Sequence, residues 1–188
     1  MWLEAFFSTL RRLARTVFLG ALVALAPALA FAAPVPLTSL TGSPAEGTWR
    51  TQNGTEITIA PCPEGFCGTL SWVVIPKAQA EMCRTTDKTA FASLMMDYQN
   101  PDKSLKTRPI LGMQMMTLTP TGDPTAFTAK IYNAEDGSTN DISVWILNGN
   151  STLRIGGGCL GSVCAVTQDW PKVPPRPVSP DFTCDGGQ

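Results

Sequence analysis

Alternating apolar and polar positions recur along the chain from residue 47 onward, in short segments separated by turn residues. Within 56–60, Ile57 and Ile59 share one face of an extended segment and Thr58 lies on the other. Asn53-Gly54 comes just before this segment and is a strong signal of a tight hairpin. Strands are predicted over 49–52, 56–60, 69–75, 110–118, 126–132, 142–147, 152–155 and 163–170. Many short strands with tight connections indicate an all-β barrel or sandwich.

Two stretches depart from this alternation. Between residues 77 and 99, apolar residues at helical spacing predict a helix of about three turns that ends at Asn100-Pro101. The residues at this spacing are Ala90, Phe91, Leu94, Met95 and Tyr98. From residue 171 onward the chain is rich in proline, which favours extended, unpaired backbone. We therefore expect a helical insertion at about 77–100 and a Pro-rich C-terminal strap over 171–188.

The first segment has the layout of a secretory signal peptide. Arg11, Arg12 and Arg15 precede an apolar stretch over 17–33, and the small residues at its end favour cleavage after Ala32. The alternative is an uncleaved membrane anchor, because the stretch approaches the roughly 20 residues that span a bilayer. Cleavage leaves a short lead over 33–46 and predicts a periplasmic or secreted protein with no stable membrane span.

Charge and composition exclude several classes of function. The chain has no histidine, so it holds no Ser-His or Cys-His nucleophile pair and no His-ligated metal. With 14 basic and 15 acidic residues, the net charge is −1, and no excess of positive charge is available to neutralise phosphates. We expect no nucleic-acid partner, no cofactor and no enzymatic activity.

Six cysteines lie beyond the leader and predict three disulfides in an oxidising compartment. Cys62 and Cys67 enclose a four-residue loop that contains glycine, and so do Cys159 and Cys164. Such loops bring two cysteines within bridging distance, so we predict one local disulfide in each. The remaining Cys83 and Cys184 then pair and tie the insertion to the tail. The alternative is a zinc site formed by the thiolates of the two local pairs, which an oxidising compartment disfavours.

Several stretches, in order along the chain, resemble the bacterial domain of unknown function 2147 family of exported proteins. They include Gly47-Thr48-Trp49, Ile59-Ala60-Pro61-Cys62, Asn100-Pro101-Asp102, Arg108-Pro109, Glu135-Asp136-Gly137 and Gly158-Cys159-Leu160-Gly161. The resemblance implies that 47–170 is a small antiparallel lipocalin-like β-barrel whose first-strand Trp49 plugs the closed end. The family pattern departs at the last strand, where an arginine expected over this tryptophan is replaced by Pro171-Lys172. The family carries no assigned chemistry.

A barrel of this size either is filled by its own side chains or holds one small ligand. Large rings on strands are expected to face inward or line a rim, and Arg108 is placed to meet an anionic ligand at the mouth. The predicted ligand-binding residues are Trp49, Trp72, Arg108, Tyr132 and Trp145. The sequence thus predicts binding of a small apolar or amphipathic molecule.

Two other functions stay open. In the first, the barrel is filled and the helix and strap contact an envelope or secreted protein. In the second, methionine thioethers bind Cu(I), which soft sulfur ligands select. The methionines concerned are Met82, Met95, Met96, Met113, Met115 and Met116. We expect Met113 and Met115 on one strand face and Met116 on the opposite face, and core filling explains such residues as well.

Three further motifs favour structural roles. Gly156, Gly158 and Gly161 match a dinucleotide-binding pattern, but no helix follows them, so we assign them to a tight turn around the second disulfide. Glu135-Asp136 is predicted to form a turn rather than a catalytic carboxylate pair. Asp102 and Arg108 are expected to pair and pin the loop that crosses the end of the barrel.

Overall fold

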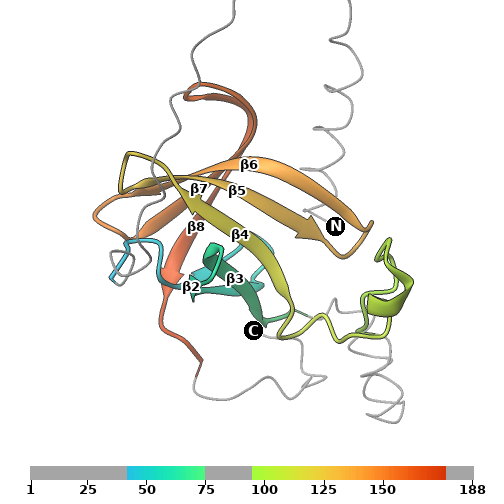
Figure 1. The fold of residues 1–188 in the computed structure, drawn as a ribbon. Helices are drawn as coiled ribbons and strands as arrows, with labels where there is room; N and C mark the ends of the chain where they lie inside the picture. Colours follow the sequence, from blue (N-terminus) through green and yellow to red (C-terminus); the bar gives the residue numbers. More distant parts are fainter. Residues whose placement is uncertain (1–41, 75–94, 177–188) are drawn as a thin grey trace, which may run out of the picture.

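The structure is a computed structural model that describes residues 42–74 and 95–176. Its eight strands form one closed antiparallel barrel in which each strand pairs with its neighbour in sequence and the last returns to the first (Figure 1). The strands are β1 (Gly47–Arg50), β2 (Glu56–Cys62), β3 (Gly65–Trp72), β4 (Gln114–Pro120), β5 (Ala126–Asn133), β6 (Ser138–Leu147), β7 (Thr152–Leu160) and β8 (Val163–Val173). The expected all-β antiparallel barrel is confirmed, and the sandwich is excluded.

The turns form where the sequence places residues that tolerate positive φ. Gly54 has a φ of 87° in the turn between β1 and β2, and its amide donates to the Thr51 carbonyl at 3.0 Å. Gly137 has a φ of 73° in the turn between β5 and β6, where Asp136 Oδ1 accepts from the Ser138 amide at 2.9 Å. Asn53-Gly54 and Glu135-Asp136 are therefore turn residues, as predicted.

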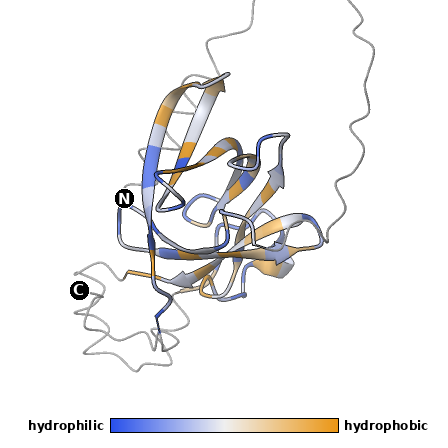
Figure 2. Cartoon of the chain, turned by 90° about the vertical axis from the view of Figure 1, so that its left-hand side faces the viewer, coloured by the Kyte–Doolittle hydropathy of each residue, from blue (hydrophilic) through white to orange (hydrophobic). Residues whose placement is uncertain are grey.

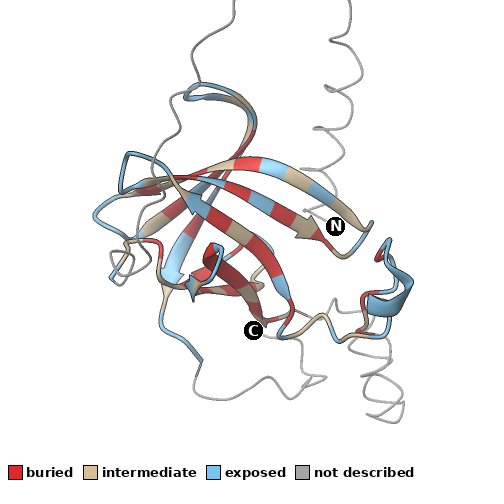
Figure 3. Cartoon of the chain, in the orientation of Figure 1, coloured by how far each residue is buried: buried red, intermediate tan, exposed pale blue. Residues whose placement is uncertain are grey.

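The core lies inside the barrel, and the inward positions alternate with exposed ones (Figures 2 and 3). Along β5, the buried positions are Phe127, Ala129, Ile131 and Asn133. Trp49 is fully buried, and its indole Nε1 donates to the Ala45 carbonyl at 2.8 Å, so burial leaves no polar atom of the ring unpaired. Burial of each large apolar side chain stabilises the fold by about 1.5–3 kcal/mol.

A short seam between the first and last strands closes the barrel. β1 pairs with β8 through Thr48↔Val173 and Trp49↔Lys172. The ammonium of Lys172 lies 5.0 Å from the centre of the Trp49 ring, within the range of a cation–π contact. A lysine thus takes the position over the plug tryptophan at which an arginine was expected.

Strand β8 continues to Val173, and the expectation that paired chain ends at Trp170 is wrong. Pro171 lacks an amide donor, yet it lies opposite Thr152 in the register of β7 and β8. The backbone of Lys172 donates to the Ser151 carbonyl at 2.9 Å, which restores the pairing one residue later. Residues 171–173, which were predicted to be part of the strap, therefore belong to β8.

The helix predicted over 77–99 lies mostly outside the described residues, but its last turn does not form. Met96 pairs with Pro109 in an isolated β-bridge, and the Asp97 amide donates to the Arg108 carbonyl at 3.0 Å. The described helical element in this region is a short 3-10 turn, η2 (Lys103–Leu105), which Asp102 caps by accepting from the Ser104 amide. Met95 is buried and Tyr98 is 49% exposed, so the two residues do not share one buried helix face.

A bulge in β4 changes the prediction for the methionines. Gly68 pairs with Met116 and Thr69 with Gln114, so one extra residue of β4, Met115, is inserted in the register. Met115 and Met116 are consequently both buried in the same core, although alternation places Met116 on the opposite face.

Both local disulfides are confirmed. Cys62–Cys67 closes the hairpin of β2 and β3, and Cys159–Cys164 links two residues that lie directly opposite each other in the hairpin of β7 and β8. Since these sulfurs bond each other, they are not thiolate ligands, and the alternative zinc site is wrong. Disulfides fit an extracytoplasmic protein. The predicted Cys83–Cys184 bridge and the signal peptide lie outside the described residues, and no helix within the described part is long and apolar enough to cross a bilayer.

Candidate functional site

One end of the barrel contains an apolar cavity of about 120 Å³. Ile57 of β2, Ile131 of β5 and Ile155 of β7 contribute to its walls, and the buried Trp170 of β8 also faces it. The remaining apolar lining residues are Leu70, Val73, Ile110, Met113, Met115 and Ala134. Exposed Asn53 and Glu135 also line the cavity, so it opens to solvent at this rim.

Three side-chain amides line the cavity, and each has its oxygen held by the protein. Asn133 Oδ1 accepts from the Glu135 amide at 3.1 Å, and Gln168 Oε1 accepts from the Trp170 indole at 3.0 Å. At the rim, Asn53 Oδ1 accepts from the Thr55 amide at 3.2 Å and contacts the Thr51 hydroxyl. Asn133 is 1% exposed and its Nδ2 is buried without a partner.

A polar cluster fixes the loop beside the cavity. The carboxylate of Asp97 is fully buried and accepts from the Tyr132 hydroxyl at 2.6 Å and from Asn100 Nδ2 at 2.7 Å. Arg108 donates from Nε to Oδ2 of the same carboxylate at 2.9 Å. A buried charge is tolerated only when it is paired and hydrogen-bonded, as here. The loop that contributes Ile110 and Met113 to the cavity is thereby anchored to strand β5.

The same cluster changes the acidity of the tyrosine. Burial, followed by the hydrogen bond to the Asp97 carboxylate, raises the pKa of Tyr132 from 10.0 to about 12. The Arg108 guanidinium lies 5.7 Å from the centre of the Tyr132 ring. Arg108 pairs with Asp97 and not with Asp102, so the predicted partner is wrong while the predicted role, pinning this loop, is correct. Asp102 instead caps η2.

None of the five residues predicted to bind a ligand lines this cavity. Arg108 and Tyr132 lie together in the cluster beside it, and Trp49 belongs to the filled part of the core. Trp145 lies half-buried between the buried Val144 and Ile146, on the outer face of β6, so it does not face inward as expected.

The fifth residue, Trp72, is covered by the side chain of Arg176. The guanidinium of Arg176 stacks 3.9 Å from the centre of the Trp72 ring and donates to Glu56 Oε1 at 3.2 Å. Glu56 is 1% exposed and also pairs with Arg50 at 2.9 Å. A hollow of about 330 Å³ lies beside this contact on the outer side of β2 and β3. The charged groups of Glu56 and Arg176 in this hollow pair with each other, which indicates a structural role.

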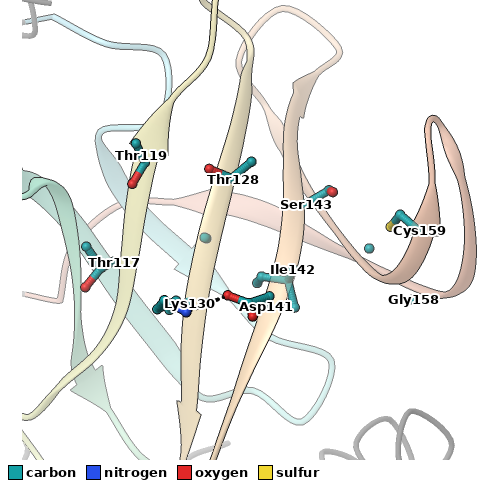
Figure 4. Close-up of a pocket in the computed structure, with 11 residues that line it drawn as sticks. Thr117, Thr119, Thr128, Lys130, Asp141, Ile142, Ser143, Gly158 and Cys159 are labelled. Atoms are coloured by element: carbon teal, nitrogen blue, oxygen red, sulfur yellow. Dashed lines mark hydrogen bonds and ion pairs between the residues drawn. The ribbon is translucent and has the colours of Figure 1, made fainter. Parts of the chain in front are cut away.

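A larger groove of about 550 Å³ lies on the outer face of β4 to β7 (Figure 4). Thr117, Thr128 and Ser143 line it, and Lys130 and Asp141 form an ion pair of 2.7 Å within it. Both charged side chains are mostly exposed and satisfy each other. The groove therefore offers no buried, unpaired group, in contrast to the interior cavity.

Two of the cavity's polar residues were detectable from the sequence but were missed. Asn133 continues the inward series of β5, two residues after Ile131, and Gln168 lies two residues before the buried Trp170. Polar side chains at inward positions of a strand are the signal. The strand predictions ended at Tyr132 and did not examine which face Gln168 occupies.

The glycine-rich motif is structural, but only Gly161 lies in the predicted turn, because Gly156 and Gly158 belong to strand β7. Gly156 lies in β7 under the Cys159–Cys164 bridge, and a β-carbon there would lie 2.5 Å from Cys164 Sγ and 2.8 Å from Trp145 Cζ3. Gly161 has a φ of 62° in the two-residue turn between β7 and β8. These positions need glycine for close packing and for the turn.

Comparison with known proteins places the chain in a family. A search of curated proteins found no match. A solved structure described as protein HP1028 from the human pathogen Helicobacter pylori, of the lipocalin family, is 18% identical, covers 69% of this chain and 82% of its own, and has a TM-score of 0.48. The family model described as "Uncharacterized protein conserved in bacteria (DUF2147)" matches residues 47–172. The chain therefore belongs to this family of bacterial proteins, as the sequence motifs indicated.

Proposed function

We propose that this protein binds a small amphipathic molecule whose apolar part enters the end of the barrel. The observation that carries this proposal is the cavity of about 120 Å³, which apolar side chains line and which polar residues rim. Ligand sites combine an apolar lining with a few placed polar groups, as this cavity does.

The volume limits the ligand. A site for a drug-sized molecule is at least about 300 Å³, whereas a cavity of about 150 Å³ holds one benzene. The cavity accordingly accepts a short chain or a small ring, with the polar end of the ligand on the side of Asn133 and Glu135. A large lipid is too big to enter.

Titration with 1-pentanol tests this function, with chemical shifts of the Ile131 and Met115 amides as the measurement. We expect saturable shifts at these lining residues. Val73→Phe fills the cavity and should abolish the shifts. Val166→Phe is the matched control, because Val166 is another half-buried valine packed on the core but does not line the cavity. Equal shifts in both variants would contradict the proposal.

A second function has one specific observation in its favour. The hairpin of β7 and β8 bends away from the barrel (Figure 1), and Leu160 and Val163 at its tip are 88% and 74% exposed. The disulfide Cys159–Cys164 holds this tip in shape. An exposed aliphatic pair on a fixed hairpin favours contact with a hydrophobic surface of a partner protein.

A photo-crosslinking side chain at position 160 tests the second function in the native host, with position 149 as the control. Gly149 is the exposed tip of the turn between β6 and β7, which has polar neighbours. A partner captured from position 160 must also bind the purified protein, and Leu160→Ser with Val163→Ser must weaken this binding. Crosslinks of equal yield from both positions, or binding that the double variant retains, contradict a role for the tip.

A further inference from the structure

The amides in the cavity have orientations that chemistry alone determines. The group facing Asn133 is the backbone N–H of Glu135, and the group facing Gln168 is the indole N–H of Trp170. Both groups only donate, so the amide atom that meets each of them must be oxygen. The NH₂ end is therefore the remaining end of each amide.

The buried Asn133 marks the position of a missing acceptor. Alternation along β5 directs this side chain into the barrel, and its Nδ2 is buried with no partner. A buried donor without a partner costs free energy, and native proteins rarely leave one. Gln168 is 8% exposed, lies on an inward position of β8 and lines the same cavity. The cavity thus has two inward amides, and the donor end of Asn133 has no partner.

The charge of the residues that line the cavity decides whether a charged or a neutral acceptor fits. Among the described residues that line the cavity, Glu135 is the only ionisable one, and no lysine or arginine lines it. A carboxylate or phosphate would be buried here without a cation and beside an acidic side chain, which is costly. A neutral oxygen has no such penalty.

We propose that the ligand is an uncharged molecule with a carbonyl oxygen and a short apolar chain, such as a small amide, ester or ketone. Its oxygen accepts from Asn133 Nδ2, and its apolar chain contacts Ile131, Met115 and Trp170. This inference rests on the proposed function of the cavity and names the chemistry of the ligand.

The test compares four probes with the same chain and different heads: pentanamide, pentanoate, pentylammonium and pentane. We expect pentanamide to bind at least about tenfold more tightly than each of the others, because pentane and pentylammonium offer the buried donor no acceptor and pentanoate would bury its charge. The side-chain NH₂ signals of Asn133, read by NMR in the unaltered protein, should shift with pentanamide and not with pentane.

Asn133→Asp provides the matched variant. The new side chain keeps an oxygen to accept from the Glu135 amide but replaces the donor by an acceptor. Pentylammonium, which donates to the new carboxylate, should bind more tightly, and its affinity relative to that of pentanamide should rise by about tenfold. Asn140→Asp is the control, because Asn140 is half-buried on β6, donates to Ser138 at 3.3 Å and does not line the cavity. This variant should leave all four affinities unchanged.

The outcomes distinguish failure of the carbonyl inference from failure of the proposed binding function. If pentanoate or pentylammonium binds best to the unaltered protein, or if pentane and pentanamide bind equally, the carbonyl inference is wrong and the cavity still binds apolar chains. If none of the four binds, the proposed function itself fails. Because the NH₂ shifts are measured on the unaltered protein, an unfolded Asn133→Asp does not prevent a decision.

Discussion

Lys172, on the last strand of the barrel, contacts two residues of the first strand, Gly47 and Trp49. The lysine ammonium lies 5.0 Å from the ring centre of Trp49. A β-carbon on Gly47 would lie 2.4 Å from Lys172 Cε, and Gly47 has a φ of 127°. The glycine two residues before the tryptophan is therefore required by the lysine that replaces the expected arginine.

This contact predicts non-additive effects of substitution. Gly47→Ala should lower the free energy of unfolding by about 1–3 kcal/mol from backbone strain, with more from the clash. Lys172→Ala should cost about 0.5–1 kcal/mol for the lost cation–π contact. The double variant should lose less free energy of unfolding than the sum of the two single losses, because alanine at position 172 removes the atoms that clash with the new β-carbon. Urea denaturation measures all three, and strict additivity would show that the two residues do not compete for space.

The buried carboxylate of Asp97 predicts a large loss of stability in Asp97→Asn. The amide cannot accept from Arg108, Tyr132 and Asn100 together, and the arginine loses its charged partner. We expect a loss of about 3–5 kcal/mol in the free energy of unfolding. Asp102→Asn is the control: Asp102 is exposed and asparagine caps as well as aspartate does, so the loss there should be small. A similar loss in both variants would contradict the role of Asp97.

Tyr132 predicts a loss of stability at alkaline pH. Its pKa is raised from 10.0 to about 12, so below pH 10 the hydroxyl is protonated in both the folded and the unfolded chain. Between pH 10 and about 12 only the unfolded chain releases the proton, and the free energy of unfolding falls as the pH rises. Tyr132→Phe should lack this part of the decline. Identical pH profiles for the two proteins would contradict the raised pKa.

The same residue can be followed directly. The tyrosinate absorbance that is lost in Tyr132→Phe should titrate near pH 12 in the unaltered protein. Asp97→Asn should lower this pKa, because the carboxylate that accepts from the hydroxyl and repels the phenolate is gone. A pKa that stays unchanged in Asp97→Asn would assign the whole shift to burial.

The disulfide in the hairpin of β7 and β8 predicts a local effect. Cys159→Ala with Cys164→Ala should cost about 2 kcal/mol or less, since the bridge closes a short loop. Hydrogen exchange should accelerate in the hairpin tip and stay slow at Val144 and Ile155, which pair inside the barrel. The matched control is Cys62→Ala with Cys67→Ala, which should leave exchange at the tip unchanged. Faster exchange throughout the barrel would contradict a local role.

Arg176 predicts a change in the environment of Trp72 with little effect on stability. Arg176→Ala removes the cation stacked on the ring, while Glu56 keeps its pair with Arg50. We expect acrylamide to quench more of the tryptophan fluorescence and the free energy of unfolding to fall by about 1 kcal/mol or less. Lys130→Ala is the control, because Lys130 forms an exposed pair with Asp141 and lies opposite Thr117 and Asp141 in the sheet, neither of which is a tryptophan. No change in quenching would show that Arg176 does not cover Trp72.

Much of the fold was predictable because alternation and turn residues are local signals. Ile57 and Ile59 mark the inward face of β2, and the spacing of Cys62 and Cys67 predicts their bridge. The partner of Arg108 was not predictable in this way. Asp97 reaches Arg108 through a loop that is held by Tyr132, and Tyr132 lies 35 residues from Asp97 in sequence. Local patterns do not report such contacts.

The cavity lies inside the predicted barrel, but the residues that line it differ from the five residues predicted to bind a ligand. Large rings were favoured because they fill space, yet Trp145 alternates with Val144 and Ile146 and so lies outside. The bulge at Met115 reverses which face of the sheet each later residue of the strand occupies. Local sequence patterns do not predict a bulge. The inward positions of Asn133 and Gln168 follow from alternation with Ile131 and Trp170, but that both residues line one cavity is seen only in the complete barrel.

The seam between β1 and β8 also determines the order of assembly. These two strands are the first and the last of the barrel, and only two residue pairs join them. A chain that emerges from a ribosome or a translocation pore N-terminus first must hold Trp49 uncovered until Lys172 has left the pore. Closure of the barrel is therefore the last step when the chain emerges N-terminus first. A factor that shields hydrophobic segments of the emerging chain is needed until the whole domain has emerged.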